Sequence, residues 1–156
     1  VFVGRKRIDW AAVLLAYGGV QAFYLALFYS GIDDGTVDPD DFLRSVDPGP
    51  REWIQDLLSG VVLAPIFEEL MFRGVLFMGM MKRLGAPLAA LFSTVLFAVV
   101  HTQYDPWGMF SVGVFGLACC WLVLRTGSIK SGIILHLLVN GLITLEVYLF
   151  YQLPHS

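Results

Sequence analysis

Five apolar segments, each long enough to cross the roughly 30 Å hydrocarbon core of a bilayer, limit how this chain can fold. They cover residues 8–29, 53–81, 87–104, 109–124 and 133–153. Hydrophobic residues make up 57% of the 156 residues and charged residues only 15%, a composition typical of integral membrane proteins. The sequence therefore predicts one all-α domain, a polytopic membrane bundle of about five transmembrane helices.

The cationic residues predict how these segments are oriented. They form three clusters, Arg5-Lys6-Arg7, Lys82-Arg83 and Arg125 with Lys130. Five crossings would place all three clusters on one side of the membrane, and cytoplasmic loops carry an excess of Lys and Arg. We therefore expect a cytoplasmic N-terminus, an acidic non-cytoplasmic loop over residues 31–52, and a core that spans residues 53–153.

The first apolar segment also has features of a secretory signal peptide, because basic residues precede it. However, the run over residues 8–29 is longer than a typical signal core and has no clear small-x-small cleavage site at its end. We interpret it as a retained span of a multi-pass protein in a prokaryotic inner or plasma membrane. The net charge of -3 is small and evenly spread, which gives no indication of a nucleic-acid partner.

The second apolar segment carries Glu68, Glu69 and Arg73 near its middle. An ionisable group at that depth costs roughly 2.5–3.5 kcal/mol on insertion scales, so a functional role is the default interpretation. Glu69 and Arg73 are four apart and share a helix face, where they can neutralise each other. Glu68 points roughly 100° away and lacks this partner. A carboxyl without a cation in an apolar site suits proton transfer, so we expect Glu68 to act in catalysis.

Three more polar residues interrupt later apolar segments. His101 follows Phe97 by one turn in the third segment, and His136 and Asn140 lie four apart in the fifth. Lipid-facing positions would be costly, so we expect these groups to meet Glu68 in the bundle interior. Depth counting at 1.5 Å per residue places Glu68 and His101 at a similar height, but His136 and Asn140 roughly 10 Å nearer the basic side.

A structural interpretation exists for each group taken alone. A histidine near a span end is often an interfacial residue, a His/Asn pair can join helices by hydrogen bonds, and a Glu/Arg pair can be purely structural. The three groups together, with a second glutamate that Arg73 does not need, favour function.

Three motifs together resemble the signature of the CAAX-protease and bacteriocin-processing family. In chain order, on successive segments, they are Glu68-Glu69-x-x-x-Arg73, Phe97-x-x-x-His101 and His136-x-x-x-Asn140. These are glutamic-type intramembrane proteases related to the CAAX prenyl endopeptidase. The resemblance covers residue 53 to the C-terminus. It implies that Glu68 acts as general base on a water with help from His101. It also implies that His136 and Asn140 donate to the oxyanion, while Glu69, Arg73 and Phe97 support the site.

The same resemblance leaves a zinc site open, because Glu68, His101 and His136 would supply two imidazoles and one carboxylate with an open position. The spacing lacks a local His-Glu-x-x-His element, so we favour chemistry without a metal or other cofactor. Two further alternatives are a non-catalytic binding or immunity protein of the same family and a purely structural bundle. As substrate we expect a membrane-anchored protein or peptide cut near its C-terminus, with a sorting tag (myxosortase-like) favoured over a prenylated CAAX end.

Overall fold

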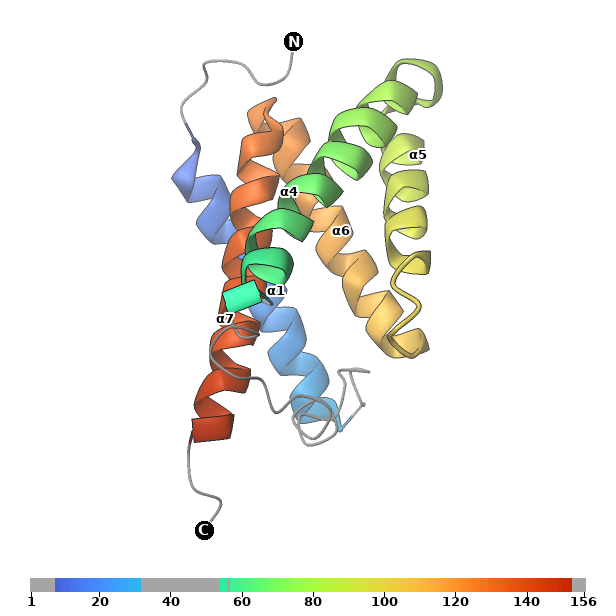
Figure 1. Ribbon diagram of the computed structural model, residues 1–156. Coiled ribbons are helices and arrows are strands. Elements are labelled where there is room, and N and C mark those ends of the chain that lie inside the picture. Colours follow the sequence, from blue (N-terminus) through green and yellow to red (C-terminus); the bar gives the residue numbers. More distant parts are fainter. Residues whose placement is uncertain (1–7, 32–53, 56, 153–156) are drawn as a thin grey trace.

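The computed structural model describes residues 8–31, 54–55 and 57–152, and every regular element within them is helical. In chain order the elements are α1 (Trp10–Ser30), the π-helix η1 (Leu57–Leu63), α4 (Ala64–Glu68), the π-helix η2 (Glu69–Phe77), α5 (Met78–Val99), α6 (Pro106–Thr126) and α7 (Ile129–Gln152) (Figure 1). This confirms the predicted all-α bundle. The first basic cluster and residues 32–52 of the predicted acidic loop lie outside the described residues.

Three of the described helices are long and apolar enough to cross a membrane. The qualifying windows are Trp10–Leu27 in α1, Pro106–Thr126 in α6 and Ile129–Glu146 in α7. They support the predicted integral, multi-pass protein. The other two predicted spans are mainly helical, but the second is divided among η1, α4, η2 and the start of α5, and the third coincides with the second arm of α5 up to Val99. The count of five crossings stays a prediction.

Helix α5 is a bent element with two arms. Gly85 has φ 76° and ψ 165°, outside the helical region, and Pro87 follows it. A positive φ of this kind is readily adopted only by glycine. The chain reverses direction there, so that the second arm runs back alongside α6 (Figure 1). The sequence places the end of the second span and the start of the third at this point, and the structure agrees.

The boundary between the third and fourth spans differs from the prediction. We expected these spans to end at residue 104 and begin at residue 109, but α5 ends at Val99 and α6 begins at Pro106. The Asp105 side chain accepts a hydrogen bond from the Gly108 N–H at 2.7 Å, and Pro106 occupies the first turn. An acidic N-cap followed by proline is a helix start rather than a turn.

Helix α6 is central to the bundle, since it packs against α1, α5, α7 and η2. One buried cluster joins residues of α1, α5, α6 and α7, among them Val13, Phe97, Leu122 and Leu135, all at most 1% exposed. This packing holds α7 beside the π-helical segments (Figure 1). Polar residues from the second, third and fifth predicted spans thereby come close together.

We expect Asp105→Ala to lower the free energy of unfolding by about 1 kcal/mol, because the Gly108 N–H loses its acceptor. Thermal unfolding of the purified protein in detergent, followed by circular dichroism, measures the change. Asp105→Asn is the matched control, since asparagine caps as well as aspartate. Equal stability of the alanine variant and the wild type would contradict the capping role.

Candidate active site

A buried ion pair lies at the centre of the polar cluster. Arg73 Nη1 is 2.9 Å from Glu69 Oε1, and both side chains are fully buried. Arg73 Nη2 also donates to the Gly116 carbonyl on α6 at 3.1 Å, and the guanidinium carbon lies 4.2 Å from the centre of the Phe97 ring. The pairing expected from the spacing is present, and it is extended by a backbone acceptor and a cation–π contact.

Glu69 also binds His136 of α7, at 3.2 Å from Oε1 to Nδ1. A carboxylate paired with an arginine can only accept, so the His136 Nδ1–H donates. This bond orients the ring so that Nε2 is the nitrogen near Glu68, 3.6 Å from its Oε2. Arg73, Glu69 and His136 thus form a continuous charged and hydrogen-bonded chain across η2 and α7.

The depth difference expected between His136 and Glu68 does not keep their side chains apart, since His136 Nε2 lies 3.6 Å from Glu68 Oε2. Helix α7 begins at Ile129 rather than at residue 133, which adds four residues, or roughly 6 Å, below His136. The earlier start raises the histidine toward the level of the glutamates.

Glu68 faces the two imidazoles through a single oxygen. Its Oε2 lies 3.9 Å from His101 Nε2 and 3.6 Å from His136 Nε2. The His101 Nδ1 lies 2.6 Å from the Phe97 carbonyl oxygen, which can only accept, so Nδ1 carries the proton. In the neutral ring Nε2 is then an acceptor directed at Glu68. The Glu68 side chain is 29% exposed, so the site remains open on this side.

Phe97 packs against His101, His136 and Arg73. Its ring is 1% exposed and makes edge contacts with Phe72, His101 and His136, at centroid distances of 5.1, 4.6 and 6.1 Å. It therefore fixes the positions of both histidines and of Arg73 by packing.

Asn140 makes its hydrogen bond elsewhere. Its Nδ2 donates to the Gly60 carbonyl of η1 at 3.0 Å, and among the described residues no hydrogen bond joins it to Glu68 or the histidines. In the i→i+5 register of a π-helix, the donor for Gly60 would be the N–H of residue 65, and Pro65 has none. Asn140 thus supplies the missing donor and links α7 to the helix that carries the glutamates.

The chain was compared with known protein families, curated proteins and solved structures. Residues 50–142, more than half of the chain, match the family described as "Type II CAAX prenyl endopeptidase Rce1-like". The chain belongs to this family. The match contains every residue of the polar cluster.

A curated protein similar to this Rce1-like chain is "Putative membrane peptidase YdiL" of Bacillus subtilis (strain 168). The two are 26% identical over 150 residues, which cover 91% of the chain and 59% of the relative. The chain therefore spans about three fifths of the relative's length. No solved structure matches.

In this Rce1-like chain, the zinc alternative would need Glu68, His101 and His136 to act together as ligands. Among the described residues, no three His, Cys, Asp or Glu side chains are grouped as a metal ion requires. We therefore derive no catalytic step through a metal.

Two glycines make room for the ion pair. A Cβ at Gly132 would lie 2.7 Å from Glu69 Oε2, and one at Gly116 would lie 3.1 Å from Arg73 Nη2. Gly132 precedes His136 by four residues, so both lie on one face of α7. That spacing is the only signal for Gly132 in the sequence.

Gly132→Ala is expected to destabilise the protein by roughly 1–3 kcal/mol, because the methyl group overpacks the buried Glu69 carboxylate. Gly79→Ala is the matched control: a Cβ there meets nothing within 4 Å, and alanine favours the helix by up to about 1 kcal/mol. Thermal unfolding in detergent compares the two variants. If both behave alike, the close contact at Gly132 is wrong.

Proposed function

We propose that this chain is an intramembrane endopeptidase in which Glu68 activates a water for attack on a peptide bond. The observation that carries the proposal is the convergence of both histidine Nε2 atoms on Glu68 Oε2, while Arg73 and Glu69 neutralise each other beneath them. Membership in the Rce1-like family and the name of the Bacillus relative support a membrane peptidase.

The spacing around Glu68 suits a bound water. Separations of 3.6 and 3.9 Å exceed a direct hydrogen bond but suit a water between the groups. Glu68 and the unprotonated Nε2 of His101 would each accept one water proton. As the water oxygen attacks the carbonyl carbon, Glu68 takes one proton and later transfers it to the leaving amine, so that the products are a carboxylic acid and an amine.

His136 would stabilise the oxyanion that forms in this attack. With Nδ1–H donated to Glu69, the ring offers an Nε2–H when it holds both protons. A single donor of this kind typically lowers the activation free energy by about 3 kcal/mol. Asn140 is the second proposed donor, through the amide hydrogen that Gly60 does not use.

The substrate we propose is a membrane-anchored protein or peptide that is cut near its C-terminus. A C-terminal sorting tag is favoured over a prenylated CAAX end, because counting at 1.5 Å per residue places Glu68 and His101 roughly 20–25 Å from the basic side of a core roughly 30 Å thick. A non-catalytic binding protein of the same family is the competing function.

Glu68→Gln should lower the cleavage rate by roughly 10²–10⁴-fold while the fold is kept, since the amide cannot accept the water proton. The assay uses vesicles that contain either a protein with a C-terminal tag, span and basic end or a prenylated CAAX peptide. Cleavage is followed by mass spectrometry, with and without a chelator.

Glu146→Gln is the matched control, since Glu146 is an exposed glutamate on α7. Full activity of Glu68→Gln would refute the proposed mechanism. Loss of activity with chelator alone would show that a metal is required. Undiminished binding of the tagged protein without any cleavage by the wild type would favour the binding protein.

Asn140→Ala separates the two roles of this side chain. If Asn140 donates to the oxyanion, kcat falls about 10²–10³-fold, and the lost bond to Gly60 adds a destabilisation of roughly 0.5–1.5 kcal/mol. We expect both changes, measured by steady-state cleavage and by thermal unfolding. A stability loss with unchanged kcat would restrict Asn140 to joining the helices.

A further inference from the structure

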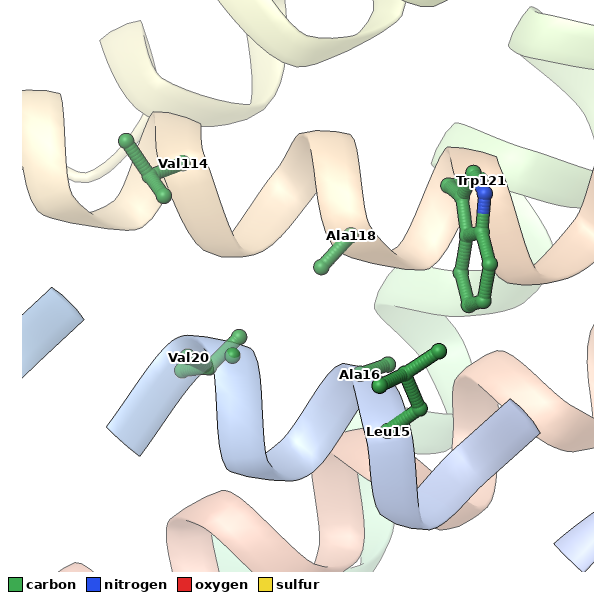
Figure 2. A pocket seen from close by; sticks show the side chains of 7 residues that line it. Leu15, Ala16, Val20, Val114, Ala118 and Trp121 are labelled. Carbon is green, nitrogen blue, oxygen red and sulfur yellow. The ribbon is translucent and has the colours of Figure 1, made fainter. Parts of the chain in front are cut away.

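A groove lies between α1 and α6, away from the glutamates. Its cavity of about 350 Å³ is lined by apolar or small residues: Leu15, Ala16, Gly19, Val20, Val114, Ala118 and Trp121. Figure 2 shows the α1 side chains of Leu15, Ala16 and Val20 facing Val114, Ala118 and Trp121 across the gap. A Cβ at Gly19 would meet nothing within 4 Å, so the space extends to the α1 backbone.

An apolar groove alone gives little selectivity in a membrane, because lipid tails are as apolar as its lining. Selectivity would have to come from a charged end. A second cavity of about 160 Å³ adjoins the groove, since Leu15 and Trp121 line both. Its lining adds Asp9 and Arg125. The apolar groove therefore continues into a second cavity whose described lining residues include one anion and one cation.

The two charges share this cavity without pairing. No ion pair within 4.0 Å joins Asp9 to Arg125, and Arg125 pairs with no other described residue. Asp9 Oδ1 accepts from the Ala12 N–H at 3.1 Å, which caps α1 and fixes the carboxylate. A guanidinium favours phosphate, and a carboxylate favours an N–H cation. A ligand that carries both groups would bridge them.

We infer that a phospholipid with a phosphate and a primary ammonium, of the phosphatidylethanolamine class, binds between α1 and α6. One acyl chain lies in the groove lined by Ala16, Gly19 and Ala118, the phosphate contacts Arg125, and the ammonium contacts Asp9. The charge complementarity of the second cavity selects this headgroup over an anionic one, which would face Asp9, and over a quaternary one, which has no N–H to donate.

The test uses the full chain in vesicles that contain equal parts of phosphatidylethanolamine, phosphatidylglycerol and phosphatidylcholine. After mild detergent extraction, native mass spectrometry counts the lipids retained. The wild type should keep phosphatidylethanolamine in roughly fivefold preference, as one surface charge contact allows. Arg125→Gln should lose the bound lipid. Asp9→Asn, which keeps the cap, should retain lipid but lose the preference.

Gly19→Leu and Gly18→Leu form the matched pair for the groove. A Cβ at either position would meet no atom within 4 Å, but only Gly19 lines the groove. Gly19→Leu should lose the lipid and Gly18→Leu should keep it, with equal helicity by circular dichroism. Equal retention of all three lipids by the wild type would overturn the inference. So would equal behaviour of the two variants, or a dimer that Gly19→Leu dissociates.

Discussion

The ion pair between Glu69 and Arg73 is the interaction on which the rest of the site depends. Both groups are fully buried, and the loss of one partner would leave the other as an uncompensated charge, which costs roughly 3–5 kcal/mol. The pair also has geometric consequences. It orients His136 through Glu69 and draws the Gly116 carbonyl of α6 toward η2 through Arg73. One interaction thus sets the relative positions of η2, α6 and α7.

Much of this could be predicted from local spacing. The i,i+4 relation of Glu69 and Arg73 predicts their contact, and the cost of charge in lipid predicts that the polar groups turn inward. The helix ends were harder to predict from the sequence. Asp105-Pro106 is a capping signal that the predicted start at residue 109 missed, and His101 lies just beyond α5, with its Nδ1 at the Phe97 carbonyl oxygen.

The contacts that join different helices could not be derived from one sequence. The bond between Glu69 and His136 links positions 67 residues apart, and nothing in either segment specifies the other. The Asn140 bond to Gly60 depends on a π-helical register, which sequence periodicity does not reveal. Gly132 shows the same limit: its importance comes from a carboxylate oxygen on another helix.

The position of the ion pair within one helix has a consequence for biogenesis. Chains are made from the N-terminus, so the predicted second span, which carries Glu69 and Arg73, emerges from the ribosome before Gly116 and His136 do. Because the two charges are four residues apart on one segment, they can neutralise each other during insertion without help from later helices. If the two charges lay on different spans, each would have to enter the bilayer without its partner. The predicted second span can therefore insert before α7 is present, whereas its contact with His136 forms only once α7 has followed.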